Sequence, residues 1–80
     1  MTPMPNPYRL NARLNTRITK NVRRLLAERG WTAEKLAFYS DVAKSNLSSL
    51  LNGKVNWTLQ TLDKLASKGF KCDINEFFQR

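Results

Sequence analysis

The segment Trp31–Lys54, WTAEKLAFYSDVAKSNLSSLLNGK, restricts the possible folds of this chain more than any other part of it. Its apolar spacing predicts two short helices joined by a tight turn at residues 40–42, with the second helix over Ala43–Leu51 and a stop at Gly53. The small side chain of Ala37 allows the two helices to cross closely. The side chains expected to face inward are Leu36, Val42, Leu47, Leu50 and Leu51.

Helical spacing recurs on both sides of this segment. Ile18, Val22 and Leu25 mark one face of a first helix that starts near residue 16, and leucines from residue 59 onward mark a fourth. A short last helix follows. The predicted caps are Asn15 or Thr16, Thr32, Thr58 and Asp73, and the predicted helix ends are Gly30 and Gly69. We therefore expect an all-α domain of five helices over residues 16–80.

Residues 1–15 follow a different pattern. Apolar Tyr8, Leu10, Ala12 and Leu14 alternate with polar residues, which is the period of a strand with one apolar face. Leucines four residues apart would also suit a helix, but the asparagines, threonines and preceding prolines favour the strand. A lone strand needs a partner, and the simplest partner is the same strand of a second copy. The alternative is a disordered basic arm, and the sequence leaves both open.

The charge distribution points to a polyanionic partner. The 80 residues hold 14 Lys or Arg against 6 Asp or Glu, a net charge of +8, and no acid precedes Glu28. A basic surface kept only for solubility is the alternative, but small domains usually intersperse both signs. With no His and a single Cys72, His-based catalysis, metal clusters and internal disulfides are excluded, and Cys72 is expected to fill a loop or the core.

These features define what else is expected. We predict no enzymatic activity, no cofactor and no small-molecule ligand. No apolar run approaches the ~20 residues that span a bilayer, and the N-terminal residues have no signal-peptide pattern. The expected location is the cytoplasm, with no membrane partner.

The outward face of the second short helix suits base recognition. No acid lies between Val42 and Leu62, so nothing on this helix repels phosphate. Lys can donate to guanine O6 and N7, Asn can pair with adenine, Ser with either base, and an alanine methyl packs on thymine. An ordinary exposed helix is the alternative, but Ser and Asn weaken a helix without compensation. The outward residues are Lys44, Ser45, Ser48 and Ser49, with Ala43 and Asn46 near the rim.

The chain over Thr16–Phe78 resembles the phage-repressor/Cro (Xre-like) helix-turn-helix family. The resemblance rests on the spaced motifs RRLL, WTxxxLA, LSxLLNGK and TLxTLxKLA, which match together. The resemblance implies, by position, which residues contact bases and which contact phosphates. The predicted base-reading residues are Ala43, Lys44, Ser45, Asn46 and Ser49, and the predicted phosphate-binding residues of the domain are Thr32, Ser48, Asn52 and Lys54. The basic arm is expected to add phosphate or minor-groove contacts through Arg9, Arg13 and Arg17.

The sequence departs from the family pattern at three positions. Ala33 stands where the family commonly has a Gln that helps to fix the register on DNA, and an alanine side chain cannot make that contact. Asp41 replaces the usual turn glycine, and Asp tolerates the left-handed conformation at modest cost. Leu51 replaces a common Glu.

The last helices of this family usually form the dimer contact. Adjacent phenylalanines cannot both face inward, so at least one is expected to be available to a partner, although this cluster could instead complete the core. The predicted interface comprises Tyr8, Leu10, Leu14, Ile74, Phe77 and Phe78. We thus predict a homodimeric, sequence-specific regulator of prokaryotic or phage type on a palindromic operator, with recognition helices ~34 Å apart. The alternative is a protein-binding module, such as an antitoxin that neutralises a partner.

Overall fold

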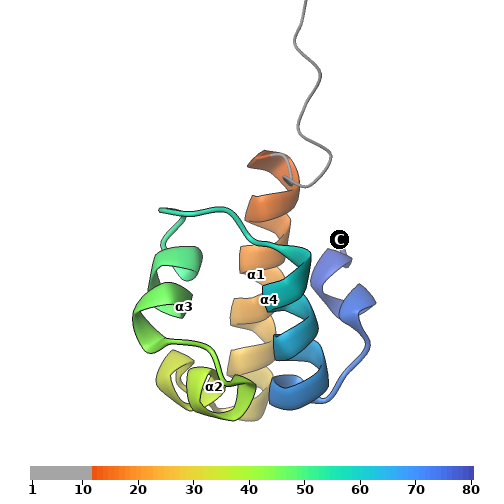
Figure 1. The fold of residues 1–80 in the computed structure, drawn as a ribbon. Helices are drawn as coiled ribbons and strands as arrows, with labels where there is room; N and C mark the ends of the chain where they lie inside the picture. Colours follow the sequence, from red (N-terminus) through yellow and green to blue (C-terminus); the bar gives the residue numbers. More distant parts are fainter. Residues whose placement is uncertain (1–11) are drawn as a thin grey trace, which may run out of the picture.

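The computed structural model describes residues 12–80, and this part of the chain is helical with no strand. The two motif helices precede a helical hairpin that closes the domain (Figure 1). The elements are α1 (Ala12–Arg29), α2 (Ala33–Ser40), α3 (Lys44–Leu51), α4 (Leu59–Lys64), the π-helical η1 (Leu65–Phe70) and the 3-10 helix η2 (Ile74–Phe78). Five helical stretches were expected; the last is a 3-10 helix, and the fourth changes from α to π geometry at Leu65.

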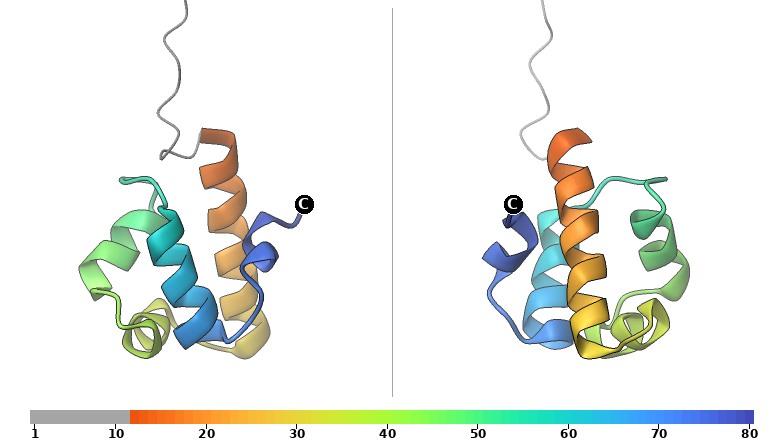
Figure 2. Two further views of the ribbon diagram at one scale, coloured as in Figure 1. Left: turned by 45° about the vertical axis from the view of Figure 1, so that its right-hand side comes forward. Right: turned by 180° about the vertical axis from the view of Figure 1, so that it is seen from behind.

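The long helix α1 runs through the middle of the fold. Seen from behind, α3 lies on one side of α1 and η2 on the other (Figure 2). A single core fills the space between the helices, with Ile18, Leu36 and Phe77 fully buried. No helix within residues 12–80 is long and apolar enough to cross a bilayer.

Helix α1 begins earlier than the sequence indicated. Residues 12–15, expected to belong to a strand or an arm, are helical, and Thr16 Oγ1 donates to the carbonyl of Ala12 at 3.0 Å. The spacing of Leu14, Ile18 and Val22 prevails over the two-residue alternation because a helix satisfies its own backbone groups, whereas a strand requires a partner. The remainder of the predicted strand or arm, including Tyr8, Arg9 and Leu10, lies outside the described residues.

Most of the predicted helix boundaries are confirmed. Thr32 and Thr58 accept hydrogen bonds from the backbone N–H groups three residues later, and Asp73 accepts one from Asn75 at 2.8 Å. Gly30 adopts a left-handed conformation (φ 65°) directly after α1. These caps are local features, since each depends on residues within one helical turn.

Gly69 does not end a helix as predicted. The helix continues through it to Phe70, and the left-handed residue that follows is Lys71 (φ 53°). Gly69 is buried where η1 presses against α2: a Cβ at this position would overlap Ser40 Oγ and lie 2.8 Å from Leu36 Cδ1. The glycine thus allows the two helices to approach closely without displacing the side chains of Ser40 and Leu36.

Candidate nucleic-acid interface

The turn between α2 and α3 has the geometry expected from the sequence. Asp41 takes the left-handed conformation (φ 58°, ψ 43°) that more often requires glycine. The N–H of Val42 donates to the carbonyl of Ala37 at 3.1 Å, and the N–H of Asp41 donates to that of Phe38 at 3.4 Å. These bonds complete the end of α2 and fix the direction in which α3 leaves the turn.

Helix α3 is held by its inner face and presents its outer face to solvent. Leu47, Leu50 and Leu51 are buried, as predicted, and Val42 packs against the core. The opposite face carries short polar side chains and one lysine. Ala43, Lys44, Ser45, Asn46 and Ser48 are exposed, and Ser49 is half-buried. The predicted base-reading residues therefore lie together on one accessible strip.

One contact on this face was not anticipated. Glu34 of α2 lies 3.3 Å from the ammonium of Lys44, and both side chains are 70% exposed. An exposed pair of this kind contributes less than about 1 kcal/mol and is screened by salt. Lys44 is therefore oriented in the free protein but can exchange Glu34 for another partner. The acid-free run from Ala43 to Thr61 gave no sign of this contact, because the acid comes from the neighbouring helix.

The first turn of α2 contacts α3 through Glu34 and not through Ala33. Ala33 is half-buried against the core and has no polar group to offer. Glu34, one residue later, supplies the polar link from the first turn of α2 to the first turn of α3. The ends of both helices that are expected to approach DNA thus lie side by side.

The loop after α3 is well ordered by short-range hydrogen bonds. The N–H of Asn52 donates to the carbonyl of Ser48 at 3.0 Å, and that of Lys54 donates to the carbonyl of Ser49 at 2.9 Å. Gly53 between them is left-handed (φ 73°), so a side chain here would strain the turn. Asn52 and Lys54 are exposed, as phosphate contacts require.

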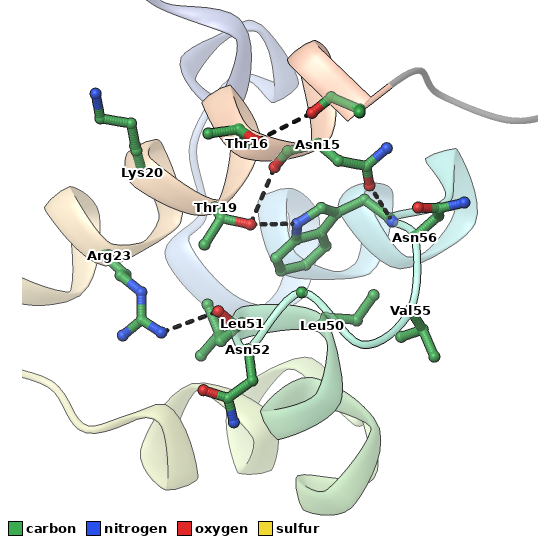
Figure 3. A pocket seen from close by; sticks show the side chains of 13 residues that line it. Asn15, Thr16, Thr19, Lys20, Arg23, Leu50, Leu51, Asn52, Val55 and Asn56 are labelled. Carbon is green, nitrogen blue, oxygen red and sulfur yellow. Dashed lines mark hydrogen bonds between the residues drawn. The ribbon is translucent and has the colours of Figure 1, made fainter.

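Helix α1 fixes this loop from the other side (Figure 3). Arg23 donates to the carbonyl of Leu51 at 2.9 Å, and the indole N–H of the buried Trp57 donates to Thr19 Oγ1 at 2.9 Å. The backbone N–H of Trp57 donates to Asn15 Oδ1 at 2.7 Å. A groove of about 420 Å³ remains between α1 and the loop. The sequence gives no local signal for these anchoring residues, because their partners lie 28 to 42 positions away.

Three predicted residues lie apart from this strip or serve another purpose. Thr32 is exposed at the start of α2, where its hydroxyl accepts from the N–H of Lys35 at 3.1 Å. Arg13 and Arg17 lie on the side of α1 that faces the C-terminal segment, where they line a second groove with Gln79. They do not line the groove beside the loop after α3.

The predicted dimer contact is partly wrong. Phe77 has no exposed surface, because its ring fills the core beside Phe70, so it cannot meet a partner. Ile74 and Phe78 are half-buried and pack against the same core. Of the two adjacent phenylalanines, Phe77 is fully buried and Phe78 is half-buried against the core. Leu14, on α1, is half-buried.

Comparisons with known proteins agree with this geometry. Residues 21–80 match the model of the Cro/C1-type HTH DNA-binding domain family. The chain is 39% identical over 61 residues to the competence pilus inhibition repressor of Acinetobacter baylyi, which covers 76% of this chain and 54% of that protein. The chain thus spans about half the length of this curated relative.

Solved structures show the same architecture. The restriction-modification controller protein C.AhdI from Aeromonas hydrophila superposes with a TM-score of 0.73 at 28% identity, covering 85% of this chain and all of that one (100%). The wild-type controller protein C.Esp1396I gives a TM-score of 0.75 at 24% identity, covering 85% of this chain and 87% of the other. The second comparison supports the fold alone.

Proposed function

The chain belongs to the Cro/C1-type helix-turn-helix DNA-binding domain family, and from this premise we propose that it binds a palindromic operator as a homodimer and reads it with α3. The family consists of DNA-binding regulators, not of enzymes. The curated relative is named a repressor. We extend that direction of regulation to this chain, so that binding lowers transcription.

The observation that carries the proposal is the division of α3 into two faces. Its leucines are buried, and every side chain on its other face is small and polar, or a lysine. In the major groove, Lys44 can donate to guanine and Asn46 can pair with adenine, while the methyl group of Ala43 can pack on thymine. Ser45 and Ser49 can bond to either kind of base.

Phosphate contacts would hold α3 in register. Thr32, Asn52 and Lys54 lie before α2 and after α3, Ser48 lies on α3 itself, and the net charge of +8 strengthens the attraction to DNA. Phosphate contacts release counterions, so binding should weaken steeply as the salt concentration rises, with a slope of about −0.9 per phosphate.

The homodimer follows from the operator symmetry that we propose. One copy of α3 reads only half a site, and a two-fold dimer places two copies about one turn of DNA apart, ~34 Å. Because Phe77 is buried, the contact must use other apolar side chains. Ile74 and Phe78 are half-buried, and Val55 and Leu59 are exposed beside the loop after α3. Sedimentation at increasing protein concentration measures the monomer–dimer equilibrium.

Selection of bound fragments from random duplex DNA tests base reading. We expect a two-fold symmetric consensus from the wild type. Lys44→Ala combined with Ser45→Ala should remove most of the sequence preference while leaving the helical circular dichroism unchanged. A matched control, Ser67→Ala with Lys68→Ala, removes the same residue types from η1, away from α3, and should keep the preference. Equal binding to all sequences by the wild type would refute the proposal.

A protein-binding module remains the second candidate, and one observation favours it. Phe38 on α2 is 83% exposed and contacts the half-exposed Tyr39 at a ring distance of 5.9 Å. Exposed aromatic side chains of this size often act as anchors in protein interfaces. Salt separates the two candidates, because an interface centred on Phe38 would be nearly insensitive to salt, whereas DNA binding would not.

A further inference from the structure

Three cations form a stripe along α1, and all three line the groove between this helix and the C-terminal segment. Arg13, Arg17 and Lys20 are spaced i, i+4 and i+7, which places their Cα atoms about 6 and 4.5 Å apart along the helix axis. None of the ion pairs formed within residues 12–80 involves any of them. Like charges at this spacing destabilise a helix. The stripe is therefore a cost to the free protein that an anionic partner would remove.

Beyond Lys20, the next cation on this side of α1 is paired with acidic side chains. Arg24, one turn further along, pairs with Glu28 at 3.1 Å and with Glu76 at 3.7 Å. Its charge is therefore already compensated by neighbours in the fold. The uncompensated positive charge lies toward the N-terminal half of α1.

A groove accompanies the stripe. It measures about 810 Å³ and lies between α1 and the C-terminal segment. Asn21 holds this segment in place, because its amide donates to the carbonyls of Phe77 at 2.8 Å and Gln79 at 2.7 Å. All eight lining residues are polar, and five of them are Arg or Lys.

The groove is connected to the surroundings of the recognition helix. Thr16 and Lys20 line both this groove and the one in Figure 3, where Asn52 and Gly53 form the far side. Figure 2 shows α1 between α3 and the C-terminal segment. A basic surface thus begins beside the loop after α3 and continues around α1 to its other side.

The polar, positively charged lining of the groove indicates which class of partner binds there. Protein interfaces depend on buried apolar or aromatic anchors, and the groove has no apolar lining residue. Interfaces with DNA are polar and strongly positive, and a duplex offers a regular row of phosphates. We propose that Arg13, Arg17 and Lys20 form a second phosphate-binding surface, which holds duplex DNA outside the segment that α3 reads. This inference rests on the proposed DNA-binding function and extends it.

The DNA on this surface has two possible sources: the flank of the same duplex, or a second duplex. Two probes that share one central sequence separate them, a duplex of about 16 base pairs and one of about 40 base pairs. Affinity is measured by fluorescence anisotropy across a range of salt concentrations, and stoichiometry by titration at high protein concentration.

The variant is Arg13→Gln with Arg17→Gln, since Gln keeps helix propensity but removes the charge. The matched control is Lys64→Gln with Lys68→Gln, which lowers the net charge equally at residues of α4 and η1 that do not line this groove. We expect the variant to reduce the salt slope by about 1.8, or 0.9 for each of two lost phosphate contacts, and the control to leave the slope nearly unchanged.

If the loss appears only on the long duplex, the surface holds flanking DNA. If the wild type takes up a second short duplex and the variant does not, the surface bridges two duplexes. Equal slopes and stoichiometries for variant and control on both probes would overturn the inference while leaving base reading by α3 intact. Failure of the wild type to bind either duplex would overturn the proposed function as well.

Discussion

Replacing Gly69 by alanine tests how tightly the helix-turn-helix unit is set against the rest of the domain. The added Cβ would overlap Ser40 Oγ and lie 2.8 Å from Leu36 Cδ1, and both partners belong to α2. Ser40 is fully buried, and its hydroxyl has no hydrogen-bond partner. The two helices must therefore separate slightly, or the side chains must leave their rotamers.

The opposing effects can be estimated. Overpacking a well-filled core costs about 1–3 kcal/mol, whereas Ala gains about 1 kcal/mol over Gly in helix propensity. We therefore expect Gly69→Ala to lower the free energy of unfolding by up to about 2 kcal/mol. Ser40→Ala alone should raise it by about 1 kcal/mol, since it removes a buried hydroxyl that makes no hydrogen bond. In a domain of this size, 1 kcal/mol shifts the Tm by roughly 4–8 °C.

Thermal and urea denaturation followed by circular dichroism measure these changes in a double-mutant cycle. The double variant should be more stable than the sum of the single changes implies, by about 0.5 kcal/mol or more, because Ser40→Ala removes one of the overlapping atoms. Strict additivity, or a Gly69→Ala variant more stable than the wild type, would refute the packing argument.

Three further predictions concern single positions. Asn21→Leu should lower the free energy of unfolding by about 2 kcal/mol, and the urea midpoint with it, because the carbonyls of Phe77 and Gln79 lose their donor; an unchanged midpoint would contradict this. Asp41→Gly should raise the free energy of unfolding by up to about 1 kcal/mol by relieving the left-handed strain, and so raise the Tm; a lower Tm would count against that strain. Burial raises the pKa of the Cys72 thiol above its ordinary value of 9.0, with Arg29 opposing the shift only in part. The folded thiol should therefore react with iodoacetamide more slowly at pH 8 than the urea-unfolded thiol does. Because the folded state retains this proton more tightly, the free energy of unfolding should fall as the pH rises above about 9, and a rise there would contradict the shift.

Local sequence signals determined much of the candidate site. The caps Thr32 and Thr58, the left-handed Asp41 and the inward leucines of α3 depend on residues within a turn or two of each other. Periodicity and side-chain chemistry therefore sufficed to predict which face of α3 is exposed. The family motifs, which lie along one stretch of chain, were readable for the same reason.

Tertiary structure decided what depends on neighbours distant in the chain. The sequence predicts a helix end at Gly69, but the glycine instead lies where η1 packs closely against α2. It also predicts that Phe77 contacts a partner, but the ring of Phe77 is buried in the core. The pairing of Glu34 with Lys44 and the groove beside Arg17 likewise arise only when separate helices meet. A sequence determines local backbone preference and the polarity of each face, whereas the volume that a side chain fills, and the charge that it meets, belong to the assembled fold.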